Sequence, residues 1–360
     1  MESELSVPPL HIRRLYLAYK YVLKASSFSN NVTINSLKQL STLCETRYWQ
    51  RKKIPLLVKS YNKTKIMNIQ SSPFLESFSL STWLSRIDIE NILLSKLESV
   101  KQSKKLYEKN SLKLNIIEEL ENKYHDWHKI YTDGSKSAKL QGAAFFDSSR
   151  AISRCYKVTN DVCIMTLELI AISEALRYAA SYNWDKIIVY SDSKTAIQHL
   201  ARSASGIRGV SIAYTILSQL YEFSLRDICA KVQWIPSHIG LLGNEEADRL
   251  ANSACVNGVE YNINPCYSEV LPKFRNLCHT EWKEFFNERS KTKGIWYKTI
   301  QSEPPRIPWF IDTKINRNII KIMFRIRTGH IPSKKFSYLM KKTDSPNCET
   351  CGVIEDLHHF

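Results

Sequence analysis

Four acidic side chains in the middle third of the chain stand where they could bind metal ions together. They are Asp133, Glu168, Asp192 and Asp248. Clustered carboxylates repel one another, so their pKa values rise unless a positive charge joins them. Hard divalent cations such as Mg²⁺ prefer oxygen ligands and keep waters for phosphate groups. Two such ions can stabilise both the attacking and the leaving oxygen of a phosphodiester, so the acids indicate metal-assisted phosphodiester cleavage.

The residue patterns around these acids predict an α/β domain. Apolar runs and alternating residues predict five strands, at 129–132, 142–146, 151–158, 187–190 and 231–235. Helical spacing predicts helices at about 165–181, 194–204, 209–223 and from 244 onward. Ser193 and Asn244 are the expected N-caps of two of these helices. The order of elements predicts a mixed sheet of about five strands flanked by helices.

In this layout each acid falls at the boundary of an element. Asp133 is expected at or nearly at the end of the first strand, and Asp192 directly after the fourth. Glu168 and Asp248 are expected in the first turns of two helices. Ligands of open α/β sheets bind at strand ends and helix starts, so the four acids are expected to meet. Taken singly, each acid has an ordinary alternative as a surface carboxylate or, for Asp248, as a helix-dipole partner.

The sequence blocks that contain these acids resemble type 1 ribonuclease H. They read Tyr-Thr-Asp133-Gly-Ser, Glu168-Leu-Ile-Ala-Ile, Tyr-Ser-Asp192-Ser and Trp234-Ile-Pro-Ser-His238-Ile-Gly-Leu-Leu-Gly-Asn244-Glu-Glu-Ala-Asp248. The resemblance covers about residues 128–256 and implies a ribonuclease H-like fold. It implies that the four acids hold two Mg²⁺ ions, with Mn²⁺ as an alternative, and hydrolyse the RNA strand of RNA–DNA hybrids. It also implies that His238 assists proton transfer or product release.

The resemblance suggests some substrate contacts and leaves others without a matching residue. The backbone amides of Gly134 and Ser135 are expected to contact the cut strand, and Asn244 is a third expected substrate-binding residue. Better-studied members carry an amide side chain shortly before the catalytic Glu, where this chain has Met165, Thr166 and Leu167. After Asp192, no basic insertion is visible between the helices, where Arg202 and Arg208 are the only cations. We therefore expect hybrid affinity to depend on the basic flanks or on a partner domain.

The net charge of the chain, +16 over 360 residues, lies mainly in its flanks. Residues 1–127 carry 20 basic against 12 acidic side chains, residues 128–256 carry 14 against 12, and residues 257–360 carry 17 against 11. A cationic surface of this kind is typical of proteins that bind nucleic acid, although a basic surface that only keeps the protein soluble is the alternative. The first flank begins with an amphipathic helix from about Ile12, which reads as a packed helix or as a binding helix.

Both flanks look like parts of Jockey-like non-LTR retrotransposon polyproteins. The matching stretches are Pro8-Pro9-Leu-His-Ile-Arg-Arg-Leu-Tyr-Leu-Ala-Tyr-Lys-Tyr and the run from Asn316-Arg317 to His330. We therefore expect a mostly helical connecting region over 1–127, after a reverse transcriptase domain that is absent here, and a basic helical region over 257–360. Within the first flank, residues 71–82 are Ser-rich and predict a loop, and residues 95–113 predict a linker or an exposed helix.

The C-terminal tail carries residues at a spacing typical of zinc ligands. Cys348 and Cys351 offer thiolates, and His359 or His358 offers an imidazole. A closed structural zinc site takes four ligands, so Zn²⁺ binding, an incomplete knuckle and a free thiol pair all stay open. The remaining cysteines are scattered and fit no secreted disulfide framework. Arg13, Arg14 and Lys20 interrupt any signal-peptide core, and no apolar stretch is long enough for a membrane span, so we expect residence in the nucleus or cytoplasm.

Three functional hypotheses follow from the sequence. The first is an active Mg²⁺-dependent ribonuclease H, in which the four acids and His238 perform the cleavage. The second is a catalytically weak remnant of a retrotransposon polyprotein that binds nucleic acid. The basic flanks support this hypothesis. The third is another enzyme of the same fold, such as an exonuclease or a transposase. Those enzymes share the acids but generally lack a glycine-flanked histidine loop like the one around His238.

Overall fold

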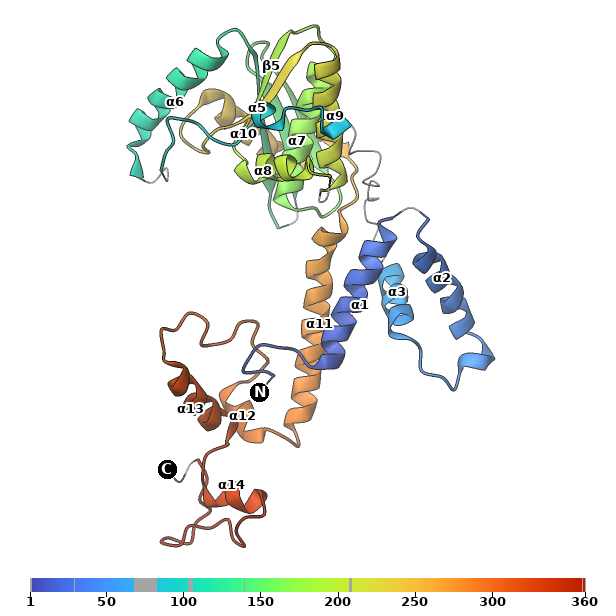
Figure 1. Ribbon diagram of the computed structural model, residues 1–360, viewed down its shortest axis with the longest axis vertical. Coiled ribbons are helices and arrows are strands. Elements are labelled where there is room, and N and C mark those ends of the chain that lie inside the picture. The colour runs from blue at the N-terminus through green and yellow to red at the C-terminus, as the bar shows by residue number, and fades with distance from the viewer. Residues whose placement is uncertain are drawn as a thin grey trace. The chain divides into compact units, whose positions relative to one another are not determined.

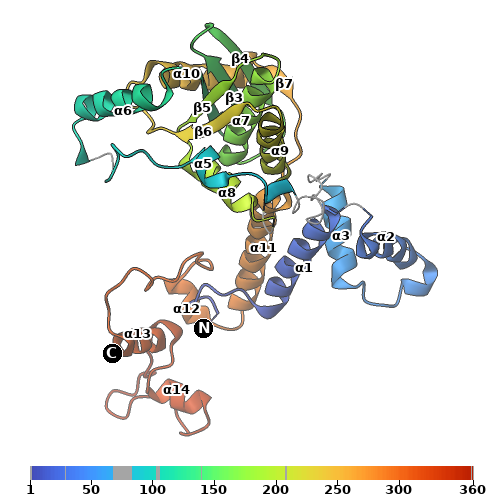
Figure 2. The ribbon, with the colours of Figure 1, turned by 45° about the horizontal axis from the view of Figure 1, so that its top comes forward.

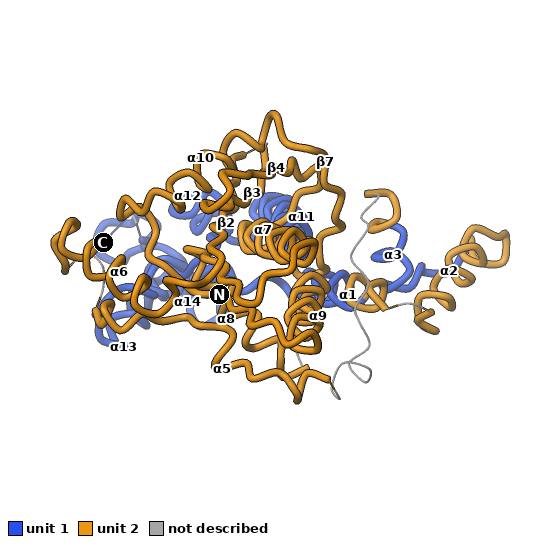
Figure 3. The backbone as a smooth tube through the Cα atoms, turned by 90° about the horizontal axis from the view of Figure 1, so that it is seen from above, with its two compact units in different colours: residues 1–21, 51–62, 271–360 blue, residues 22–50, 63–270 orange. Residues whose placement is uncertain are grey.

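The computed structural model describes residues 2–28, 30–67, 83–102, 106–138, 140–206, 209–357 and 359. The chain forms two compact units (Figure 3). Unit 1 comprises residues 1–21, 51–62 and 271–360, and unit 2 comprises residues 22–50 and 63–270. The predicted loop at 71–82, Arg208 and His358 lie outside the described residues.

Unit 2 contains one mixed sheet with the strand order β1-β6-β5-β2-β3-β4-β7. Figure 2 labels β3 to β7 of this sheet. Its strands are β1 (Leu93–Leu94), β2 (His128–Lys136), β3 (Gln141–Asp147), β4 (Ile152–Val158), β5 (Lys186–Ser191), β6 (Cys229–Trp234) and β7 (Val259–Tyr261). The antiparallel pairs β2–β3 and β3–β4 form a meander, whereas β2–β5, β5–β6, β1–β6 and β4–β7 are parallel. The five predicted strands are thus present as β2 to β6, and a short strand extends the sheet at each edge.

Helices cover both faces of this sheet (Figure 1). The first face packs against α7 (Ile164–Ala179), α8 (Lys194–Ser203) and α9 (Ser211–Leu225). The second face packs against α6 (Lys109–Tyr124) and α10 (Leu242–Asn257). Successive side chains of a strand point to opposite faces, so Ile187 and Val189 of β5 join the first core, whereas Ile188 and Tyr190 join the second. This explains why β5 is a continuous apolar run.

Two predicted boundaries differ in the structure, and one is confirmed. Asn244 is not an N-cap, because α10 begins two residues earlier and has Leu241 at the cap position. The carboxylate of Glu245 instead reaches back and accepts a hydrogen bond from the Gly240 amide at 3.0 Å. Asp133 does not end its strand, since β2 stays paired with β3 as far as Lys136. Ser193 does cap α8, where its hydroxyl accepts from the Ala196 amide at 3.4 Å.

The flanks are helical, as predicted. Unit 2 also contains α2 (Val32–Cys44), η1 (Arg47–Trp49) and α5 (Ile89–Ile92). Unit 1 contains α12 (Ile295–Ile300), α13 (Arg317–Thr328) and α14 (Lys334–Leu339). The helices α1 (Leu10–Ser26), α3 (Leu56–Ile66) and α11 (Tyr267–Ser290) have residues in both units. Across the described ranges, no helix combines the length and the apolar character that a bilayer crossing requires.

Unit 1 has its own core between α1 and α11. The Tyr19 ring packs against Phe274 with centroids 4.5 Å apart. Glu4 is fully buried, and its carboxylate accepts hydrogen bonds from Arg327 Nε at 2.9 Å and from Trp309 Nε1 at 2.7 Å. Burying a carboxylate is costly unless it is paired and hydrogen-bonded, and these contacts tie the N-terminal residues to α13.

Candidate active site

Three of the four predicted acids meet at one end of the sheet. Asp133, Glu168 and Asp192 each present a carboxylate oxygen, and these oxygens lie within 4.8 Å of one another. The parallel pairing of β2 with β5 ends at Thr132 opposite Ser191, so the next residue on each strand is an acid. Parallel strands end at the same edge of a sheet, and this places Asp133 beside Asp192.

Glu168 reaches this edge because α7 packs very closely on β2. A side chain at Gly134 would place its Cβ only 2.7 Å from the Glu168 amide nitrogen and 2.9 Å from the Leu167 carbonyl carbon. Both atoms belong to the backbone and cannot rotate away, so only glycine allows this approach. Gly134 therefore sets the distance between the strand that carries Asp133 and the helix that carries Glu168.

The N-terminus of α7 is held by an acid from outside the predicted domain. One carboxylate oxygen of Glu269 accepts hydrogen bonds from the Cys163 amide at 2.7 Å and from the Thr166 hydroxyl at 2.8 Å. Its second oxygen accepts from the Cys266 amide at 2.7 Å. An anionic acceptor satisfies free amides at a helix N-terminus and interacts favourably with the helix dipole. Glu269 thereby fixes the start of the helix that carries Glu168.

The electrostatics of the three acids favour a cation. Burial, together with the charges of Asp192 and Asp248, raises the pKa of Asp133 to about 8. Burial, followed by the charges of Asp133 and Asp192, raises the pKa of Glu168 well above its usual value. Oε2 of Glu168 is buried and has no hydrogen-bond partner among the described residues. A set of oxygen donors with an unsatisfied buried carboxylate oxygen fits a hard divalent ion such as Mg²⁺.

Asp248 flanks the three acids without joining their tight group. Its charge contributes to the raised pKa values of Asp133 and Glu168, so it lies near both. One of its oxygens accepts a hydrogen bond from Asn252 Nδ2 at 3.3 Å, on the same helix. Asn252 Oδ1 in turn accepts from the Ser135 hydroxyl at 2.6 Å. The structure therefore links Ser135 to the helix of Asp248, and the tight carboxylate group contains three of the four predicted acids.

The remaining predicted residues lie around this group. His238 is exposed and has a positive φ of 54°, a conformation that is uncommon for a residue with a side chain. Ile235 before it and Ile239 after it are buried against α6, so the loop is anchored on both sides of an exposed imidazole. Asn244 is 2% exposed, and its Oδ1 has no hydrogen-bond partner in the described part of the chain. Asn244 thus has a buried polar atom on α10, the helix that also carries Asp248.

A second group of candidate ligands lies in unit 1. Sγ of Cys348, Sγ of Cys351 and a ring nitrogen of His359 lie within 4.8 Å of one another. The Cys351 sulfur is 3.1 Å from Nε2 of His359. Hydrogen bonds from the backbone amides of Cys351 and Thr350 lower the pKa of the Cys348 thiol. Thiolates and imidazole are zinc ligands, and these three residues supply three of the four positions of a structural site.

A cavity of about 480 Å³ borders the acids on the side of Asp192. It is lined by Asp192, Lys194, Trp234, Pro236 and Ser237, and by Val100, Lys101 and Gln102. The last three precede the predicted domain, and sequence reasoning missed them. A usable signal was present nearby, because Leu112, Ile116, Leu120 and Tyr124 recur at every fourth residue and form the buried face of α6.

The RNase H family model matches residues 126–256. Two similar solved structures are RNase H1 from the halophilic archaeon Halobacterium salinarum and an N-terminal RNase H domain from Mycobacterium tuberculosis, fused to maltose-binding protein. The first has 18% identity and a TM-score of 0.28, covering 35% of this chain and 96% of its own. The second has 17% identity and a TM-score of 0.27, covering 36% and 94%. No curated protein sequence matches the chain. The chain therefore contains an RNase H domain at residues 126–256.

Proposed function

We propose that the protein is a metal-dependent endonuclease that hydrolyses the RNA strand of RNA–DNA hybrids. The observation that carries the proposal is the group of Asp133, Glu168 and Asp192, whose oxygens lie within 4.8 Å of one another. This group lies inside the residues that match the RNase H family. Two buried acids with raised pKa values, Asp133 and Glu168, beside the half-buried Asp192 are costly to the fold unless they serve a cation, which makes a role in metal binding the best explanation.

In this proposal the acids hold two Mg²⁺ ions, with Mn²⁺ as an alternative. Asp133, Glu168 and Asp192 are the inner ligands, and Asp248 approaches from α10. When bound, such ions lower the pKa of a water and stabilise the departing 3′ oxygen. Glu168, 5% exposed, keeps its carboxylate away from bulk water, which strengthens its attraction to a cation.

Other residues of the chain orient the substrate and move protons. The backbone at Gly134 and Ser135 lies next to Asp133 and offers contacts to the cut strand. His238 projects from its anchored loop, so a ring nitrogen can accept a proton and release it to solvent. The two strands of a hybrid differ in the 2′-hydroxyl, which is the group that distinguishes the RNA strand.

The test is cleavage of matched substrates in Mg²⁺. The protein is incubated with labelled RNA–DNA hybrid, RNA duplex and DNA duplex, each with free or blocked ends. We expect internal cleavage of the RNA strand of the hybrid alone, and a loss of several orders of magnitude in Asp133→Asn, because a metal ligand is removed. Hybrid binding without cleavage would support the remnant hypothesis instead, and cleavage only from free ends would support an exonuclease.

The wider context is a further part of the proposal. The sequence resemblance of both flanks supports an origin in a retrotransposon polyprotein, with a reverse transcriptase domain as a partner and with nuclear or cytoplasmic residence. The group of Cys348, Cys351 and His359 supports a Zn²⁺ site in unit 1. Copurification with a separately expressed reverse transcriptase domain tests the partner, and elemental analysis of the purified protein tests the metal.

A further inference from the structure

The segment that precedes the RNase H match joins the sheet directly beside the active site. Its strand β1 pairs in parallel with β6, with Leu93 opposite Val232 and Leu94 opposite Gln233. Gln233 is 2% exposed, and its Nε2 donates to the Lys96 carbonyl at 3.1 Å. Its Oε1 accepts from the Tyr124 hydroxyl at 3.1 Å. The buried Gln233 side chain therefore binds the preceding segment near its beginning, at Lys96, and at its end, at Tyr124.

Within this segment, the loop at residues 98–102 is held from two sides. The Glu119 carboxylate accepts hydrogen bonds from the amides of Glu98 at 2.9 Å and Ser99 at 2.8 Å, and from the Ser99 hydroxyl at 2.6 Å. Burial alone would raise the pKa of Glu119, but the hydrogen bonds from Ser99 and Glu98 outweigh it and lower this pKa to about 2. The hydrogen bonds from the loop thus keep the Glu119 carboxylate ionised.

The far half of the loop is bound to the Tyr107 hydroxyl. This oxygen accepts from the Lys101 amide at 3.1 Å and from the Gln102 amide at 3.2 Å. The side chains of Lys101 and Gln102 are exposed and line the cavity beside Asp192. A loop whose backbone amides are already bound loses little conformational entropy when its side chains take a ligand.

Positively charged side chains lie in the cavity and next to the His238 loop. In the cavity, Trp234 Nε1 donates to the Asp192 carbonyl at 3.1 Å, and the Lys194 ammonium lies 4.6 Å from the centre of the Trp234 ring. Next to the His238 loop, the Lys113 ammonium would lie 3.4 Å from a Cβ placed on Gly240. Lys113 belongs to α6, so residues outside the RNase H match supply positive charge at both places.

We propose that residues 93–102 and 106–124 form a substrate-binding element, in which Lys101 beside Asp192 and Lys113 beside the His238 loop bind backbone phosphates of the hybrid. Lys194 completes the cavity from within the domain. Residues 128–256 carry nearly balanced charge, so basic residues from elsewhere in the chain are needed to add net attraction for phosphates. An exposed ammonium and an amide such as Gln102 are the groups that position a nucleic-acid backbone without reading its sequence. This inference rests on the proposed function, because it assumes that the acids cut a nucleic acid.

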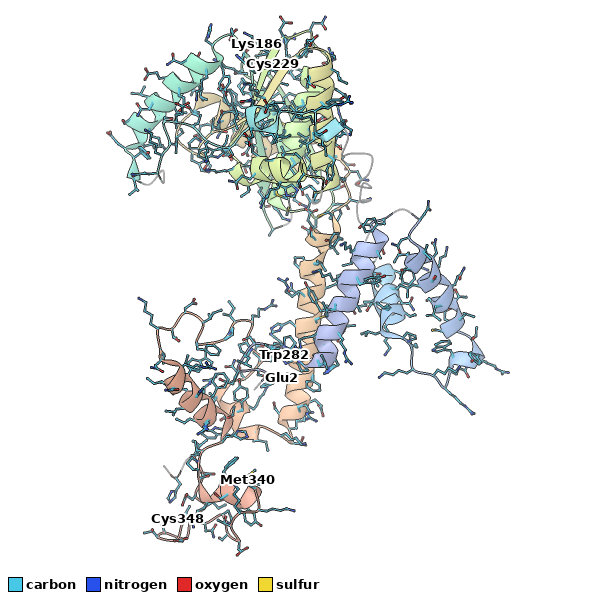
Figure 4. All side chains as sticks on the ribbon, viewed as in Figure 1. Glu2, Lys186, Cys229, Trp282, Met340 and Cys348 are labelled. Atoms are coloured by element: carbon cyan, nitrogen blue, oxygen red, sulfur yellow. The ribbon has the colours of Figure 1, made fainter. Side chains whose placement is uncertain are left out.

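The test compares the variant Lys101→Gln/Lys113→Gln with Lys186→Gln in the full chain. Lys186 is the first residue of β5, and Asp192 directly follows its last residue. The control therefore removes a positive charge from the end of β5 that lies away from Asp192. Figure 4 marks Lys186 beside Cys229, its partner in the register of β5 and β6. Binding of a fluorescent hybrid is measured by anisotropy in EDTA, so that no cleavage occurs, over a series of salt concentrations.

We expect the double variant to bind the hybrid about tenfold more weakly, with the slope of log K against log salt reduced by about 2. In Mg²⁺, its KM should rise while kcat stays within about twofold, because the lysines bind substrate and do not touch the metal ions. Lys186→Gln should change neither quantity. All three proteins should show the same thermal unfolding midpoint, which separates lost contacts from lost folding.

The inference is overturned if the double variant binds with the parental affinity and salt slope, or if Lys186→Gln weakens binding equally. Either result can occur while the parent still cleaves hybrid and Asp133→Asn does not, so it leaves the proposed function standing. Failure of the proposed function has a different signature, which is a parent protein that binds hybrid and never cuts it.

Discussion

The buried acids predict that Asp133→Asn stabilises the metal-free protein while it abolishes cleavage. Asp133 is 5% exposed, and its pKa rises from 3.8 to about 8 on folding. A carboxyl whose folded pKa is raised disfavours folding as the pH rises from its unfolded pKa towards its folded pKa. Each pKa unit corresponds to about 1.4 kcal/mol, so the charge costs up to about 5 kcal/mol at pH ~7.5 and about 2 kcal/mol at pH ~5.5. Asparagine carries no charge at either pH and avoids this cost.

The measurement is thermal unfolding of the parent and the variant in EDTA at these two pH values. A domain of 150–250 residues gains about 2–4 °C in Tm per kcal/mol, so the variant should melt several degrees higher at pH ~7.5. The difference should shrink clearly at pH ~5.5, because taking up the proton on folding costs less as the pH approaches the unfolded pKa of the carboxyl. Addition of Mg²⁺ should raise the Tm of the parent and leave the variant nearly unchanged, because ligand binding stabilises only the protein that can bind it.

A second buried aspartate provides the matched control. Asp147 on β3 is fully buried, but its carboxylate lies 2.8 Å from His128 Nε2 and accepts from the Tyr178 hydroxyl at 2.9 Å. Asp147→Asn removes a satisfied acceptor and should therefore lower the Tm in EDTA. The reasoning is refuted if Asp133→Asn melts below the parent at pH ~7.5, or if its advantage does not grow between the two pH values.

Three other replacements test the histidine loop, the thiol group and the packing of α10. His238→Ala should lower kcat by about 10²-fold or more with little change in hybrid binding, since the proposed function gives the exposed imidazole a role in proton transfer; an unchanged kcat would contradict this role. The parent should retain zinc through dialysis and Cys348→Ser should lose it, because Cys351 without the second thiolate should not hold the ion. Elemental analysis measures the zinc content. Gly142→Ala should lower the Tm by several degrees, because its Cβ would lie 2.3 Å from the Ala251 carbonyl oxygen; a Tm equal to the parent's would contradict the tight packing.

The sequence predicts the central domain because its signals are local. The five main strands, the helices α7 to α9 and the Ser193 cap each follow from a few adjacent residues and are confirmed. The prediction for Asn244 is wrong, because a capping side chain and a buried helical asparagine look alike until the start of α10 is known. The strand end at Asp133 is also wrong, since it depends on how far β3 extends alongside β2.

The surroundings of the site could not be predicted because they depend on distant partners. β1 has two residues and β7 has three, which is too short for any periodic pattern. The loop at 98–102 takes its shape from Glu119 and Tyr107, and its position from the buried Gln233 more than one hundred residues away. No local sequence signal distinguishes such a loop from a linker, although the four-residue repeat in α6 shows that the helix beside it packs on something.

The hydrogen bonds of Glu269 predict a limit on how this RNase H domain can be exchanged between proteins. The family match ends at residue 256, yet Glu269 binds the amide of Cys163 and the hydroxyl of Thr166 at the start of the helix that carries Glu168. If only the matched residues were exchanged with those of another protein, the start of α7 would meet a residue other than the one it packs against in its own chain. We expect such a chimaera to recover activity only when position 166 and the residue that contacts it are inherited together. The segment that has to be transferred together therefore extends beyond residues 126–256, at least as far as Glu269.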